Sequence, residues 1–215
     1  GEQRLHPDAE RRRPPDGEAG AARDARRHPA LIQLPDPPLA DEEVVLGPFR
    51  DDDADAVVAA CRDPLVQRFT RVPIPYGLLD AHAFIDGAPV RRARGESLEL
   101  AVRDRDGRLL GAIGFIVDRF DPGQAEVGYW VAPAARGRGI ATRALRLLSA
   151  WALREAGLVR LSLTASLENP ASLRVAERAG FRREGIMRDA WPRGPRGRED
   201  LALYGLLAAD LGPPA

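Results

Sequence analysis

Lysine is missing from this chain, and each of its 32 basic residues is an arginine. The absence excludes chemistry that needs a lysine amine, such as Schiff-base formation. It also excludes a Walker-type phosphate loop, which relies on its lysine. Acidic residues number 32 as well, so the formal net charge is zero. A balanced charge gives no general electrostatic attraction to nucleic acid or to an anionic membrane.

Cysteine occurs once, as Cys61, which excludes an internal disulfide and a cysteine-based zinc cluster. Its helical spacing with Ala54, Val57 and Val58 predicts a core position rather than a nucleophile. No apolar run approaches the roughly 18 residues of a membrane span, and no signal-peptide apolar segment is recognisable at the N-terminus. We therefore expect a cytoplasmic protein that needs no metal ion and has no membrane or nucleic-acid partner.

Residues 1–40 differ in composition from the rest. They hold seven of the 19 prolines, seven arginines and seven acidic residues, without a sustained apolar period. Such a segment cannot bury enough apolar surface to offset the entropy lost on ordering. We expect residues 1–40 to be a flexible N-terminal extension and residues 41–215 to form a single domain.

From residue 44 the apolar pattern becomes that of a globular domain. Alternating and apolar runs predict strands, and helical spacing with caps predicts the helices between them. The predicted order is strand, two helices, three antiparallel strands, helix, strand, helix and two strands. The strands are expected at 44–46, 97–102, 109–117, 124–131, 160–165, 181–187 and 200–207. This order indicates an α+β fold with a mixed sheet rather than a doubly wound nucleotide-binding fold.

The segment Gly128–Leu145 reads GYWVAPAARGRGIATRAL. An apolar strand ends in a turn at Pro133, and an Arg/Gly loop then opens directly into a helix. Backbone N–H groups at a helix start, in a loop with few side chains, bind phosphate groups well. The segment therefore predicts a site for a phosphate-bearing ligand.

Three interpretations compete for this loop. A dinucleotide fingerprint needs a third glycine where Thr142 stands, and the antiparallel strands upstream do not suit that fold. RNA-binding Arg/Gly segments are repeated and disordered, whereas this is one copy between apolar elements. The third interpretation is an acyl-coenzyme loop, since Arg136 to Ala141 match the pattern Q/R-x-x-G-x-G/A.

At this point the chain resembles the GNAT N-acetyltransferases, in particular the RimJ/RimL type that acetylates the N-termini of ribosomal proteins. The resemblance covers about residues 44–211. Besides the loop it rests on the segments 126–131, 169–172, 179–181 and 200–204, in that order and spacing. It implies a GNAT-like, mainly antiparallel sheet of six to seven strands, flanked by helices on both faces.

The resemblance implies acetyl-CoA as co-substrate. Its pyrophosphate would lie on the N–H groups of Gly137 to Thr142, with charge added by Arg136 and Arg138. Its pantetheine arm would pair near Trp130 and Val131, where a backbone N–H polarises the thioester carbonyl. The expected coenzyme-binding residues are Trp130, Val131, Arg136, Gly137, Arg138, Gly139, Ile140, Ala141, Thr142, Asn169 and Ser172.

Two side chains are candidates for catalysis by the same resemblance. The Ser172 hydroxyl would protonate the leaving thiolate, although it could also serve only as a first-turn hydroxyl bonded to backbone. Glu126 would be the general base, with an arginine-paired strand carboxylate or a bound water as alternatives. Asn169 is expected both to cap its helix and to contact the coenzyme.

The function implied is transfer of an acetyl group to a primary amine by direct attack in a ternary complex. The amine could belong to a protein N-terminus or to a small molecule, and a homodimer is compatible with this function. Trp130, Asp189, Trp191 and the loop 73–76 could line the acceptor pocket. The alternatives are a non-catalytic acyl-CoA-binding module with the same fold and, less directly, nucleic-acid binding through the arginine-rich segments.

Overall fold

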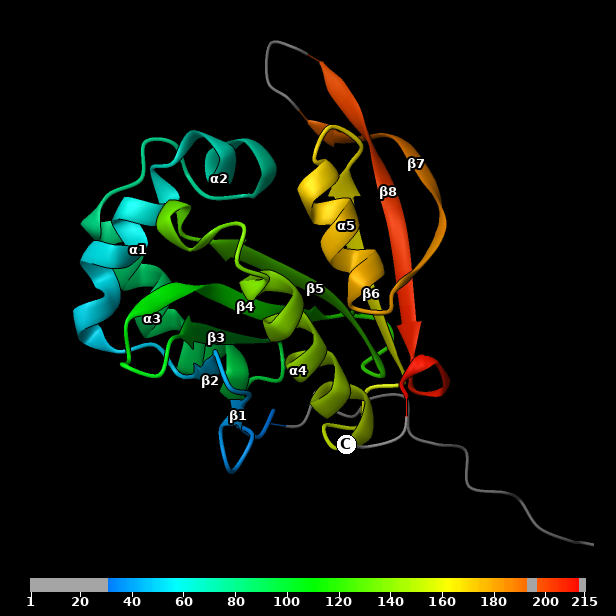
Figure 1. Ribbon diagram of the computed structural model, residues 1–215, viewed down its shortest axis with the longest axis horizontal. Coiled ribbons are helices and arrows are strands. Elements are labelled where there is room, and N and C mark those ends of the chain that lie inside the picture. Colours follow the sequence, from blue (N-terminus) through cyan, green and yellow to red (C-terminus); the bar gives the residue numbers. More distant parts are fainter. Residues whose placement is uncertain (1–30, 193–196, 213–215) are drawn as a thin grey trace, which may run out of the picture.

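The computed structural model describes residues 31–192 and 197–212. Within them, eight strands form one sheet in the order β1-β2-β3-β4-β5-β6-β8-β7 (Figure 1). Every neighbouring pair is antiparallel except β5 and β6, which are parallel. The strands are β1 Leu39–Ala40, β2 Val45–Gly47, β3 Ser97–Arg103, β4 Leu109–Val117, β5 Gln124–Val131, β6 Arg160–Ser166, β7 Arg182–Pro192 and β8 Arg198–Leu207. The mixed, mainly antiparallel sheet is confirmed, with β1 in addition to the seven expected strands.

Helices cover both faces of the sheet. They are α1 Ala54–Cys61, α2 Pro64–Phe69, α3 Leu78–Ala93, α4 Ile140–Arg154 and α5 Pro170–Arg178. In Figure 1, α4 and α5 lie in front of the sheet and α3 lies behind it. The larger core joins α4 and α5 to the sheet, and a smaller core joins α1 and α3. In the part of the chain that is described, no helix has both the length and the apolar character to cross a bilayer.

Cys61 lies in the smaller core, 1% exposed. Burial raises the pKa of its thiol to about 11, so the thiolate is scarce at neutral pH. The core position predicted from helical spacing is confirmed.

The folded domain begins earlier than residue 41. Ile32 donates its N–H to the Arg92 carbonyl at 3.2 Å and accepts from the Arg92 guanidinium at 2.9 Å. The strand β1 pairs with β2, and Leu34 and Leu39 pack on the larger core. Residues 31–40 are therefore part of the domain, because apolar side chains too sparse to show a period still reach its core. Residues 1–30 of the expected extension lie outside the described residues.

The pairing of β5 with β6 is short, and this positions the site. Only Gln124, Ala125 and Glu126 of β5 pair with β6. Beyond that point β6 stays paired with β8 as far as Ser166, while β5 stays paired with β4 as far as Val131. The two strands therefore separate, and one edge of the C-terminal half of β5 has no ladder partner within residues 31–192 and 197–212.

Candidate active site

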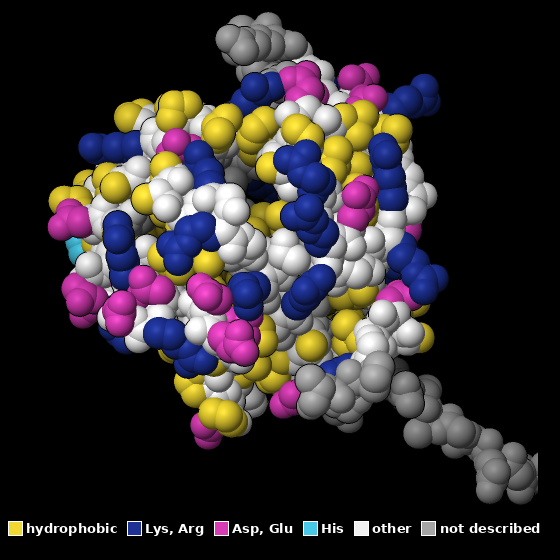
Figure 2. Space-filling view, in the orientation of Figure 1, with side chains coloured by type: hydrophobic (Ala, Val, Ile, Leu, Met, Phe, Trp, Pro, Cys, Tyr) yellow, Lys and Arg dark blue, Asp and Glu magenta, His cyan; other side chains and the backbone are white. Residues whose placement is uncertain are grey.

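A cavity of about 920 Å³ opens where β5 and β6 separate. On one side it is lined by the start of α4 and by α5, and on the other by α2, α3 and the loop between them. The space-filling view shows the hollow with arginine side chains on both sides of it (Figure 2). All of the expected coenzyme-binding residues except Arg138 line this cavity, and so does Glu126. The fold thus brings together segments that are far apart in sequence.

The unpaired edge of β5 directs backbone N–H groups into the gap. The Ala132 N–H donates to the Leu110 carbonyl of β4 at 2.8 Å. Directions alternate along an antiparallel strand, so the Trp130 N–H also points to β4, while those of Tyr129 and Val131 point away from it. The backbone donors available at this edge are therefore Tyr129 and Val131, rather than Trp130.

The Gly137–Thr142 loop has the geometry of an anion site. Gly137 and Gly139 have φ angles of +76° and +77°, which side chains with a Cβ rarely adopt. A Cβ at either position would meet nothing within 4 Å, so the space beside the loop is open. Gly139 caps α4 without a side-chain bond, which leaves the first N–H groups of the helix free of intrahelical partners. The loop, the start of α4 and the unpaired edge of β5 all line the same cavity.

The two loop arginines differ in their surroundings. Arg136 donates from Nη2 to the Asp63 carboxylate at 2.5 Å and from Nε to the Val131 carbonyl at 3.2 Å. It thereby ties the end of β5 to the start of α2, since Asp63 is the N-cap of that helix. Arg138 is exposed and is not among the described residues that line the cavity. Arg136 thus links two segments of the fold, whereas Arg138 lies at the surface.

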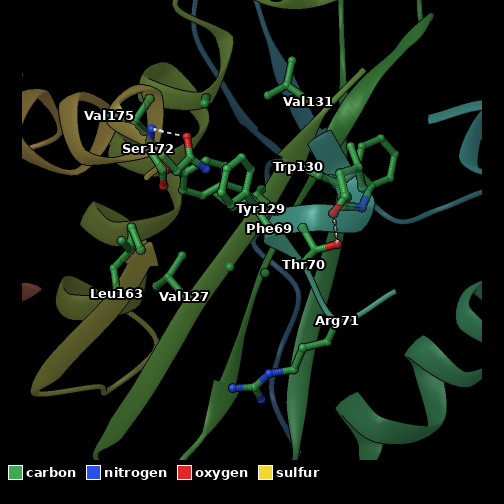
Figure 3. Close-up of a pocket in the computed structure, with 18 of the residues that line it drawn as sticks. Phe69, Thr70, Arg71, Val127, Tyr129, Trp130, Val131, Leu163, Ser172 and Val175 are labelled. Atoms are coloured by element: carbon green, nitrogen blue, oxygen red, sulfur yellow. Dashed lines mark hydrogen bonds between the residues drawn. The ribbon is translucent and has the colours of Figure 1, made fainter. Parts of the chain in front are cut away.

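Two hydroxyl groups meet on the α5 side of β5. The Tyr129 Oη and the Ser172 Oγ are 2.8 Å apart, and Figure 3 shows Tyr129 pointing toward Ser172 while Trp130 points to the other side of the strand. Burial raises the pKa of Tyr129 to about 12, so its hydroxyl is protonated at neutral pH. The Ser172 N–H donates to the Asn169 side chain at 3.1 Å, which confirms Asn169 as the cap of α5. The hydroxyl groups of Tyr129 and Ser172 can therefore hold a proton and pass it on at the gap between β5 and β6.

Glu126 lies where the β5–β6 ladder stops. Its carboxylate accepts a hydrogen bond of 2.7 Å from the Thr164 hydroxyl on β6, and its side of β5 is the side of Trp130. The described structure pairs Glu126 with a neutral hydroxyl and with no arginine. A carboxylate without a cationic partner can accept a proton from a group in the cavity.

Another part of the lining is an aromatic and acidic wall. Trp191 of β7 lies under the Arg71 guanidinium, whose carbon is 5.2 Å from the ring centre. The aromatic lining residues are Phe69, Tyr76, Phe84, Trp130 and Trp191, and the acidic ones are Asp80, Glu99, Glu126 and Glu199. Asp189, by contrast, is exposed and outside the lining. This wall suits an amine on an apolar body.

Three of the lining residues that the sequence analysis gave no role bear on the chemistry of the site: Tyr129, Arg174 and Arg178. Tyr129 was read only as part of a matching segment, although its alternation with Val127 and Val131 puts it on the core side of β5. Arg174 and Arg178 were not considered, although their spacing with Ala171 places them on one face of α5. Each signal was available locally, but which face borders the cavity depends on the tertiary structure.

The comparisons with known proteins agree with this arrangement. YdaF of Bacillus subtilis (strain 168), whose name assigns it provisionally to ribosomal N-acetyltransferases, is 39% identical over 104 residues, 47% of this chain and 55% of YdaF. The ribosomal-protein-serine acetyltransferase of Escherichia coli (strain K12) is 31% identical over 113 residues, 52% of this chain and 62% of that protein. The chain thus spans little more than half the length of these two relatives.

The fold has solved counterparts. The structure of Mycobacterium smegmatis RimJ in complex with CoA-disulfide superposes with a TM-score of 0.70, at 24% identity, over 78% of this chain and 83% of that chain. The acetyltransferase (GNAT) domain family matches residues 43–182, which is more than half of the sequence and includes the gap, the glycine loop and α5. The chain therefore belongs to the GNAT acetyltransferase domain family.

Proposed function

We propose that this protein transfers the acetyl group of acetyl-CoA to a primary amine by direct attack in a ternary complex. The observation that carries the proposal is the single cavity that joins the glycine loop to the unpaired edge of β5. A thioester of a phosphate-bearing carrier needs both features, because its phosphates and its reacting carbonyl lie at opposite ends of one molecule.

The donor would be held by backbone groups. The N–H groups of Gly137 to Thr142 would donate hydrogen bonds to the pyrophosphate, and the Tyr129 and Val131 edge would pair with the pantetheine amides. A backbone N–H of that edge would stabilise the negative charge that develops on the thioester oxygen. Arg136 would act by fixing the end of β5 rather than by contacting phosphate.

The side chains would manage the protons. Glu126, directly or through a water molecule, would take a proton from the attacking amine as its nitrogen bonds to the acetyl carbon. When the carbon–sulfur bond then breaks, the Tyr129–Ser172 pair would give a proton to the coenzyme thiolate. The products are an amide and free CoA, with no covalent enzyme intermediate.

The acceptor would enter from the aromatic and acidic wall. The names of both curated relatives point to ribosomal substrates, so a protein N-terminal amine is one acceptor class, and a small amine is the other. A homodimer is compatible with either acceptor class. We propose a cytoplasmic location, in keeping with the sequence-based expectation.

Thiol release from acetyl-CoA tests the proposal against a panel of small amines and peptides with free N-termini. We expect turnover with at least one acceptor, and loss of turnover in Gly139→Val, whose side chain would obstruct the loop. Circular dichroism controls for folding of that variant, since φ is positive at Gly139. Tight CoA binding without turnover on any amine would instead indicate an acyl-CoA-binding module.

A further inference from the structure

Two arginines on α5 face the cavity and have no side-chain partner among the described residues. Ala171, Arg174, Val175 and Arg178 line it from one face of the helix. The described structure gives the side chains of Arg174 and Arg178 no hydrogen bond, ion pair or ring contact. Like charges one helical turn apart repel each other, so their placement together favours an anion between them.

The neighbouring arginines of α4, unlike those of α5, have partners within the protein. Arg143 of α4 pairs with the Asp41 carboxylate at 3.0 Å, and Arg146 donates from Nε to the Arg178 carbonyl at 3.1 Å. Glu177, next to Arg178 in sequence, accepts from the Tyr204 hydroxyl at 3.1 Å instead. The acidic residues that line the cavity come from α3, β3, β5 and β8. Among the described lining residues, the α5 side of the cavity is therefore basic and carries no carboxylate.

We propose that Arg174 and Arg178 form a second phosphate site, which binds the 3′-phosphate of CoA. The inference rests on the proposed function, because it takes CoA as the ligand. Planar guanidinium groups bind phosphate oxygens in a bidentate manner, and two of them match the double negative charge of a phosphomonoester. Figure 2 shows arginine side chains at the border of the hollow on the α5 side as well as on the other side.

The order of groups along α5 matches the order of groups in the coenzyme. Ser172 lies at the reacting end, hydrogen-bonded to Tyr129. Arg178 lies six residues further on, about 9 Å along the axis at the usual helical rise. The thiol and the 3′-phosphate are the two ends of CoA, and the glycine loop offers backbone N–H groups to the pyrophosphate between them. The 3′-phosphate is thus the remaining anion that needs cationic side chains.

Calorimetric titration with CoA and with 3′-dephospho-CoA tests this site without an acceptor. We expect the wild-type chain to bind CoA about tenfold more tightly than the dephospho form, as charged hydrogen bonds of this kind imply. In Arg174→Ala/Arg178→Ala the affinity for CoA should fall to that for 3′-dephospho-CoA, which should itself stay unchanged. Arg174→Lys/Arg178→Lys should keep part of the preference, because the charge remains.

A matched control is Arg108→Ala, an exposed arginine in the β3–β4 turn and outside the cavity lining; it should keep the full preference. Equal wild-type affinity for the two coenzyme forms would overturn the inference alone. An equal loss of affinity for CoA and for 3′-dephospho-CoA in the double alanine variant would also overturn it, because the arginines would then bind the pyrophosphate. Absence of binding by either form would overturn the proposed function itself.

Discussion

The hydroxyl groups of Tyr129 on β5 and Ser172 on α5 lie 2.8 Å apart, although 43 residues separate them in the chain. The contact crosses the gap between β5 and the helix that follows β6. Because burial raises the Tyr129 pKa to about 12, both groups carry their protons at neutral pH. Either one can then donate to a thiolate while the other replaces its proton.

This pair predicts shared catalysis. Ser172→Ala and Tyr129→Phe should each lower kcat by about 100-fold, the lower end of the range for loss of a general acid. The double variant should be little worse than either one, since residues that act as a unit are not additive. Steady-state kinetics with an active acceptor measures kcat, and calorimetry should show unchanged CoA affinity. Additive losses would mean that the two hydroxyls act separately.

Glu126→Gln should lower kcat by about 100-fold, because the attacking amine loses its base. The variant should regain activity as pH rises, since more of the amine is then already neutral. The pH profile of kcat against that of wild type is the measurement. Thr164→Val, which removes only the hydrogen bond to Glu126, is the control and should have a smaller effect. A Glu126→Gln profile parallel to that of wild type would assign the base to a water molecule.

Trp191→Ala should raise the KM for the acceptor by about tenfold and leave CoA affinity unchanged, because Trp191 belongs to the aromatic and acidic wall beside Arg71. Phe120→Ala removes a ring that is 81% exposed and outside the cavity lining. It should change neither constant. Unchanged acceptor kinetics in Trp191→Ala would remove this wall from the acceptor site.

The Asp63–Arg136 ion pair predicts a coupling between α2 and the coenzyme loop. Asp63→Ser keeps a helix-capping hydroxyl but is too short to reach Arg136. We expect the KM for acetyl-CoA to rise by about tenfold in Asp63→Ser and in Arg136→Ala, with no further rise when the two are combined. Asp63→Asn keeps both the length of the side chain and the helix cap, so its KM for acetyl-CoA should lie between those of these variants and wild type. Additive effects would show that the two residues do not act through each other.

Stability at low pH should depend on Asp53. Burial by itself raises the pKa of this carboxyl, but hydrogen bonds from Arg103 and from the Arg50 N–H lower it on balance. A depressed folded-state pKa stabilises the fold above the unfolded value of about 3.9, and this stability is lost as pH falls through the folded value. Asp53→Asn should therefore cost about 3 kcal/mol at pH 7, since both partners of the pair are buried. The cost should shrink at acid pH.

Urea unfolding at pH 7 and at acid pH measures this cost. The exposed pair Arg94–Glu96, 3.9 Å apart, supplies the control. Glu96→Gln should change the free energy of unfolding by about 0.5 kcal/mol or less. A cost of Asp53→Asn that does not vary with pH would show that its effect is packing rather than charge.

Much of the fold could be predicted because it depends on local signals. The alternation in β3 to β5 with its Gly107 turn, and the Asn169–Pro170 helix start, each specify an element from a few residues. The short strand β1 escaped prediction, because two residues among prolines carry no period and are held only by pairing with β2. The glycine loop could be predicted for the same reason, since its glycines and the helix start that follows them belong to one segment.

By itself the sequence determined the order of the elements apart from β1 and the short helix α2, the glycine-rich start of α4 and the family resemblance. The tertiary structure decided where the parallel ladder stops, and that depends on β6 staying with β8 while β5 stays with β4. From this separation follow the backbone donors at Tyr129 and Val131, the Tyr129–Ser172 contact and the arginine face of α5. These are relations between distant segments, and only packing of the whole sheet brings them within hydrogen-bond or cavity distance.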